Sequence, residues 1–75
     1  MARKKFTKYD PENGHFIEEC ELTPEELTRL FDAVVQEGGK YTRRNEPDGS
    51  LTGEVYASMY DTIPIYDYKI TDIEE

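Results

Sequence analysis

The most regular hydrophobic pattern in the chain predicts one helix over residues 24–37. Apolar side chains recur there at intervals of three and four residues, which places them on one helical face. They are Leu27, Leu30, Phe31 and Val34. Thr23 suits the N-cap, Pro24 fits the first helical position, and Glu26 completes a T-x-x-E capping box. Two consecutive glycines follow and are expected to end the helix.

The segment before the helix, residues 4–22, predicts a β-hairpin. The sequence DPENG at residues 10–14 combines a proline that opens a turn with an Asn-Gly pair that tolerates the left-handed conformation. After the turn, alternation places Phe16, Cys20 and Leu22 on the face expected to be buried. We therefore expect Cys20 to be a small core residue.

Strand patterns return after the helix. Residues 40–44 and 51–60 predict two strands joined by the turn NEPDGS, and Gly53 is expected to mark a bulge or a bend. Residues 62–73 predict the last strand. Because Pro64 cannot donate a ladder hydrogen bond, this strand is expected at the sheet edge or to begin with a bulge.

The order of elements is ββαβββ, which predicts a small α+β fold. A mostly antiparallel sheet would carry one helix on one face. We expect a single domain over residues 1–75, with a flexible basic tail at residues 1–4 and a frayed acidic tail at residues 72–75. One helix covers only one face of a sheet, so the other face is solvated or covered by a partner.

Charge narrows the choice of partner. The chain has 9 basic and 17 acidic residues, and a net charge of −8. An acidic protein is not expected to bind nucleic acid or a membrane surface, because both are anionic. No apolar run approaches the roughly 20 residues that a membrane span needs. The lone Cys20 and the absence of a secretory signal pattern lead us to expect a reducing cytoplasm.

No motif for catalysis, metal binding or cofactor binding is visible. His15 has no serine or cysteine partner at a recognisable spacing, so we interpret it as an exposed turn residue. The segment NEPDGSLTGE resembles a calcium loop only loosely, because Arg44 stands where the first carboxylate ligand belongs. The segment DGSLTG lacks the lysine of a phosphate-binding loop. We therefore expect no enzymatic activity, no metal and no cofactor.

The segment YASMYDTIPIYDYK holds four of the six tyrosines of the chain. Tyr56 and Tyr60 alternate with Val55, so they lie on the open face if the helix covers Val55. Tyr66 and Tyr68 are expected to join them across the ladder. Tyrosine is favoured at interfaces because it combines a large rigid ring with a polar tip. The alternative is that the rings pack on one another and shield the sheet.

These features predict a non-enzymatic acidic protein that binds a larger basic host protein and inhibits or redirects it. Spaced carboxylates can imitate the phosphates of a nucleic acid, as a small phage-type DNA mimic would, and electrostatic attraction would then speed association. The expected contact residues are Glu54, Tyr56, Tyr60, Asp61, Tyr66, Asp67, Tyr68 and Asp72.

Two alternatives from other functional classes stay open. One is a structural or assembly subunit, a homodimer that pairs through the Pro64-containing edge or the tyrosine face. The other is a small RNA- or ribosome-associated factor that uses the two basic segments. Its contact residues would be Arg3, Lys4, Lys5, Lys40, Arg43 and Arg44.

Overall fold

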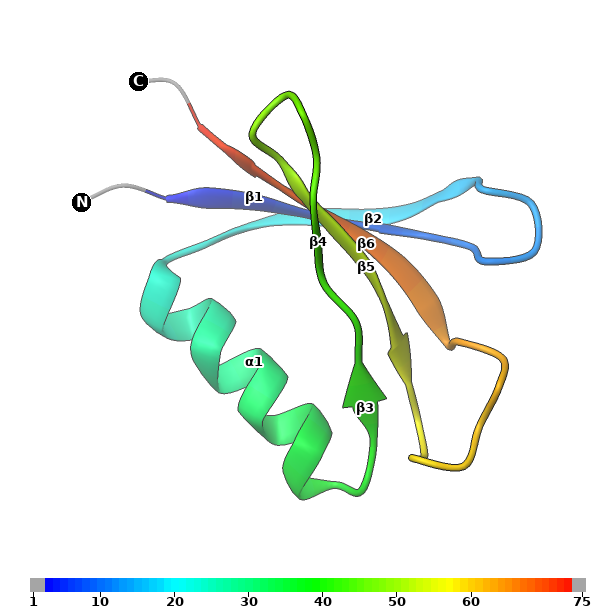
Figure 1. Ribbon diagram of the computed structural model, residues 1–75. Helices are drawn as coiled ribbons and strands as arrows, with labels where there is room; N and C mark the ends of the chain where they lie inside the picture. Colours follow the sequence, from blue (N-terminus) through cyan, green and yellow to red (C-terminus); the bar gives the residue numbers. More distant parts are fainter. Residues whose placement is uncertain (1–2, 74–75) are drawn as a thin grey trace.

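The computed structural model describes residues 3–73 (Figure 1). Its elements are β1 (Lys4–Tyr9), β2 (Phe16–Leu22), α1 (Pro24–Gln36), β3 (Lys40–Tyr41), β4 (Arg44–Asn45), β5 (Leu51–Tyr56) and β6 (Tyr66–Asp72). The six strands form one antiparallel sheet in the order β2-β1-β6-β5-β3, and β4 also pairs with β5. The helix packs on one face of this sheet, which confirms the predicted α+β fold.

Helix α1 begins as its sequence predicts. The Thr23 side chain accepts a hydrogen bond from the Glu26 N–H, and the Glu26 carboxylate accepts one from the Thr23 N–H, so both halves of the capping box form. These bonds from Thr23 lower the pKa of Glu26. The helix ends at Gln36, and Gly38 adopts φ +88°, a left-handed conformation that suits glycine and turns the chain toward β3.

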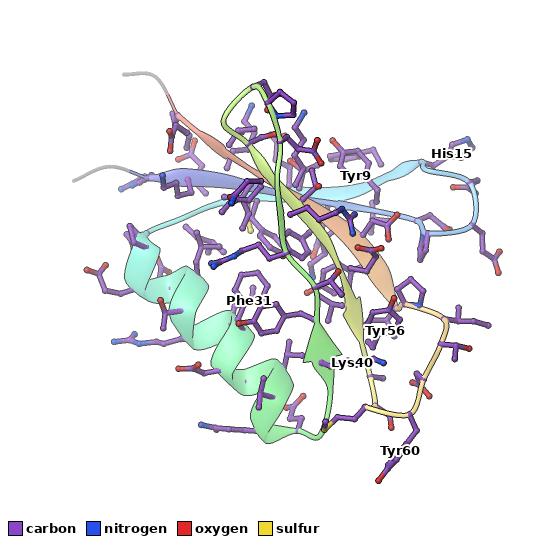
Figure 2. All side chains as sticks on the ribbon, in the orientation of Figure 1. Tyr9, His15, Phe31, Lys40, Tyr56 and Tyr60 are labelled. Carbon is purple, nitrogen blue, oxygen red and sulfur yellow. The ribbon has the colours of Figure 1, made fainter. Side chains whose placement is uncertain are left out.

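The core lies between α1 and the side of the sheet that faces it. Phe6 of β1 is at its centre: its ring stacks on Tyr68 with centroids 5.7 Å apart and meets Phe31 edge-on at 6.3 Å. Phe31 points from α1 toward the sheet (Figure 2). The buried apolar residues are Phe6, Leu27, Val55, Tyr68 and Ile70. The core thus joins strands from both ends of the chain to the helix.

The first hairpin forms where predicted, and Leu22 packs against the core as expected, but Phe16 and Cys20 do not join it. A register shift next to Tyr9 sets Phe16 opposite Tyr9, while Cys20 stays opposite Phe6. Directly opposed residues share a face, so Phe16 and Cys20 lie on opposite faces of the sheet. Both are exposed, because β2 is an edge strand with a neighbour on one side only. Cys20 is therefore not a core residue.

The second hairpin is shorter than predicted. Its turn closes with a hydrogen bond from the Gly49 N–H to the Glu46 carbonyl (3.0 Å), but β5 ends at Tyr56 and residues 57–65 form a connection to β6. Pro64 lies in this connection, and β6 begins two residues later. Strand β6 pairs with β1 and β5, so it is a central strand and not the predicted edge.

The first and last strands include one residue of each predicted tail. Lys4 begins β1 and Asp72 ends β6, where the two residues are register partners and form an ion pair. The predicted tails at residues 1–4 and 72–75 therefore each lose residues to a strand. Residues 1–2 and 74–75 lie outside the described residues.

Replacing the core phenylalanine should destabilise the fold far more than replacing an exposed one. Phe6→Ala is expected to lower the free energy of unfolding by about 3–5 kcal/mol, because it leaves a cavity among three aromatic rings. Phe16→Ala, the matched change on the exposed edge strand, should alter it by less than about 0.5 kcal/mol. Urea unfolding monitored by circular dichroism compares the two, and similar losses would contradict the assigned core.

Candidate functional site

The four tyrosines predicted to share an open face lie in three different places. Tyr68 is buried and Tyr66 is half-buried, and both face α1. Tyr56 is half-buried on the open face, under the ammonium group of Lys40 at 4.8 Å (Figure 2). Tyr60 is 94% exposed in the connection between β5 and β6. The predicted tyrosine face is therefore wrong.

Sheet register explains why two of the tyrosines turn inward. Tyr66 is opposite Val55 and Tyr68 is opposite Gly53, so both tyrosines share the helix-facing side with Val55. The connection at residues 57–65 interrupts the alternation that begins in β5. Alternation carried over from β5 therefore could not locate the side chains of β6.

Burial of Tyr68 depends on a close approach over Gly53. A Cβ atom at Gly53 would lie 2.0 Å from the Thr42 carbonyl oxygen and 2.7 Å from the Tyr68 hydroxyl, so only glycine fits. The hydroxyl passes over this space and donates a hydrogen bond to the Thr42 carbonyl. Gly53 thus marks a close contact, and the pairing of β5 with β6 continues through it without the predicted bulge.

The Thr42 carbonyl accepts the bond from Tyr68, and the Thr42 hydroxyl replaces it as the acceptor within the sheet. This hydroxyl accepts a hydrogen bond from the Glu54 N–H at 3.0 Å, in the place where a ladder carbonyl would serve. The Thr42 N–H still donates to the Glu54 carbonyl at 2.9 Å. This exchange explains why the strand predicted at residues 40–44 appears as two short strands, β3 and β4, on either side of the bond to Tyr68.

The open face of the sheet carries charged side chains. Glu54 and Asp67 lie directly opposite each other, and the Arg44 guanidinium sits 2.9 Å from a Glu54 carboxylate oxygen. Burial raises the pKa of Asp67, and the neighbouring Glu54 charge raises it further. Glu54 is also bonded to the Thr42 hydroxyl at 2.8 Å, so this predicted contact residue has a structural role.

The basic residues of the N-terminal segment are neutralised by acids on neighbouring strands. Each cation of this segment pairs with one acid: Arg3 with Glu21, Lys4 with Asp72, Lys5 with Glu19, and Lys8 with Glu18. The hydrogen bond to Glu18 raises the pKa of Lys8. Asp72, a predicted partner contact, is thus engaged within the sheet at the far end of β6 from the other predicted residues.

Pairing leaves an excess of acids on the described part of the chain, residues 3–73. Ten acids have no cation within ion-pair distance: Asp10, Glu12, Glu25, Glu26, Asp32, Glu37, Glu46, Asp48, Asp61 and Asp67. The cations without an acidic partner are Arg29, Lys40, Arg43 and Lys69. The surface is therefore strongly acidic, and its acids lie mainly on the helix and in the turns.

Exposed apolar side chains gather where the β1–β2 turn meets the connection before β6. Ile17, Ile63 and Ile65 are 50%, 71% and 53% exposed. They line one surface hollow together with Asp10, Pro11, Glu12 and Pro64, and we call it the isoleucine hollow. A neighbouring hollow is lined by Tyr60, Asp61, Thr62 and Ile63. Two predicted contact residues, Tyr60 and Asp61, therefore lie beside an apolar surface that the sequence patterns assigned to strands.

The described residues hold no group of three or more side chains arranged as metal ligands. His15 is exposed in the β1–β2 loop, and in Figure 2 it lies away from Tyr56 and Tyr60. Within residues 3–73, no helix has the length and apolar character to cross a membrane. No family model, curated protein or solved structure matches the chain.

The environment of Asp67 predicts a stabilising substitution. A carboxyl whose pKa is raised by folding is harder to ionise in the folded state, so its charge destabilises the fold at neutral pH. Asp67→Asn should raise the thermal midpoint by about 1–3 °C at pH 7. The difference should vanish near pH 3, where the side chain is protonated in both states.

Differential scanning fluorimetry across this pH range measures the effect of Asp67→Asn. Asp61→Asn is the matched control, because it removes one acid from an exposed loop and should leave the midpoint unchanged at both pH values. A lower midpoint for Asp67→Asn at pH 7 would show that burial and the Glu54 charge do not dominate at this position.

Burial of Tyr68 predicts a loss of stability in alkali. Burial raises the pKa of Tyr68 to about 12, above the ordinary value of 10.0. Between these values the unfolded chain releases the phenolic proton and the folded chain keeps it, so the free energy of unfolding falls as pH rises. Tyr68→Phe should weaken this dependence, and Tyr60→Phe should leave it unchanged. Urea unfolding at pH 9 to 12 tests the difference, and equal slopes for both variants would argue against a buried phenol at Tyr68.

Proposed function

We propose that this chain is a non-enzymatic acidic protein that binds a larger basic protein and inhibits or redirects it. The observation that supports the proposal is the pairing of charges. Internal ion pairs engage the cations of the N-terminal segment, and ten acids of the described chain stay without a cationic partner. A surface with this imbalance attracts cationic partners and repels anionic ones.

A nucleic-acid-binding protein is the class of partner that this surface suits best. Such proteins present lysine and arginine to a row of phosphates, and attraction of that kind depends strongly on salt. Carboxylates fixed on a helix and on tight turns offer similar negative charge without the sequence information of bases. Binding by the acidic protein would then occupy the surface that nucleic acid uses. We place this activity in the cytoplasm, as the lone thiol led us to expect.

The RNA-binding alternative receives less support from the geometry. Of the six cations it requires, Arg3, Lys4, Lys5 and Arg44 form ion pairs within the protein. Lys40 lies over the ring of Tyr56, a cation–π contact. Binding to phosphates would have to break these contacts. The homodimer alternative proposed pairing through a sheet edge that contains Pro64. Strand β6 is central and Pro64 lies before it, so this edge is not present.

Elution of bound proteins by salt and by DNA tests the proposed function. Immobilised protein should retain purified nucleic-acid-binding proteins at about 50 mM salt and release them at about 500 mM, because counterions screen the attraction. Excess duplex DNA should elute the same proteins at low salt. A variant with Glu25, Asp32 and Glu37 changed to glutamine or asparagine should retain less of these proteins, because it presents fewer exposed charges.

Retention that survives both high salt and excess DNA would contradict the proposal. Equal retention by the neutralised helix variant would contradict a contribution of the helix acids to this attraction. A gel shift of bulk RNA at about 50 mM salt would instead favour the RNA-binding alternative, because electrostatic binding to RNA is strongest at low salt.

A further inference from the structure

We propose that the isoleucine hollow is the docking point for a partner segment that inserts an apolar side chain between flanking lysines or arginines. This inference rests on the proposed function and names the surface that gives it specificity. An excess of acids attracts many cationic proteins, whereas an apolar hollow with an acidic border selects those that present both features together.

The hollow is not required to complete the core of the protein. Its three isoleucines stay at least half exposed, and none of them belongs to the core cluster that packs under α1. Ile63 and Ile65 flank Pro64 in the connection before β6, and Ile17 is the extra residue of β2 at the register shift, between Phe16 and Glu18. Exposed apolar groups gathered at one place on a small, highly charged chain are typical of an interaction site.

The backbone around the hollow is held in place before any partner arrives. Pro11 and Pro64 line the hollow, and their fixed φ angles limit the freedom of both segments. The Asp10 carboxylate accepts a hydrogen bond from the Glu12 N–H at 2.8 Å, and the Ile65 N–H donates to the Val55 carbonyl at 2.8 Å. A surface ordered in advance loses less conformational entropy on binding.

The charges around the hollow indicate the chemistry of the occupant. Asp10 and Glu12 line it, and Asp61 lines the adjoining hollow together with the exposed ring of Tyr60. None of the described residues that line the two hollows is a lysine or an arginine. A second copy of this chain would bring the same acids against these, so like charges disfavour self-association through this surface. A segment that is both apolar and basic matches the isoleucine side chains and the acids around them.

The probe is a short synthetic peptide of leucine and lysine, added to the full chain labelled with nitrogen-15. Amide chemical shifts of Ile17, Tyr60, Ile63 and Ile65 should change most, and the change should saturate. Two comparison peptides separate the contributions. In one peptide serine replaces leucine, which removes the apolar groups. In the other glutamine replaces lysine, which removes the charge. Either change should weaken binding about tenfold or more.

Paired variants isolate the role of the hollow without altering net charge. Ile63→Ser removes an apolar side chain from the hollow, and Val35→Ser removes one that is 56% exposed on α1, outside it. Ile63→Ser should weaken binding of the leucine–lysine peptide about tenfold, and Val35→Ser should leave it unchanged. Thermal melts should show that both variants fold, since each replaces an exposed residue.

Each outcome separates this inference from the proposed function. Shift changes spread over the acidic helix, with equal affinity in both variants, would overturn the docking site and leave an acidic binding protein. No binding of the peptide at about 50 mM salt would overturn both. A dimer in sedimentation that Ile63→Ser converts to a monomer would overturn the docking site by showing that a second copy fills it.

Discussion

The hydrogen bond from the Tyr68 hydroxyl to the Thr42 carbonyl is the constraint on which the rest of the sheet depends. A tyrosine can enter a small core only if its hydroxyl finds a partner there. Here the partner is a backbone carbonyl taken out of the ladder, which divides one strand into β3 and β4. Gly53 leaves the space that the hydroxyl crosses, and the Thr42 side chain replaces the missing acceptor. One buried polar atom thus shapes three neighbouring strands.

The same register that buries Tyr68 also decides which charged side chains form ion pairs within the sheet. Strand β1 lies between β2 and β6, so its cations face acids on both sides and form cross-strand pairs. Such exposed pairs add little stability each, but they engage positive charge within the sheet. The acids on the helix and in the turns have no such neighbours. A chain with two basic segments in its sequence therefore presents an acidic surface in three dimensions.

Parts of the candidate site could be predicted from the sequence, and parts could not. Tyr60 and Asp61 were identified as a tyrosine on an open strand face and a carboxylate beside it; both lie in a connection instead of a strand, next to the isoleucine hollow. Tyr66 and Tyr68 were misplaced because alternation does not pass through the connection at residues 57–65. Ile17 was missed because it comes together with Ile63 and Ile65 only in the fold. The repeated isoleucines around Pro64 were the one local signal.

The sequence by itself determined the helix, its capping box, the two hairpin turns and the α+β class. Each depends on side chains within a few residues of one another, whose spacing follows from the geometry of a helix or a turn. Tertiary structure decided which tyrosines are buried, which cations are neutralised and where apolar side chains gather on the surface. These properties depend on register between strands far apart in the chain, where a shift of one residue moves every side chain to the opposite face.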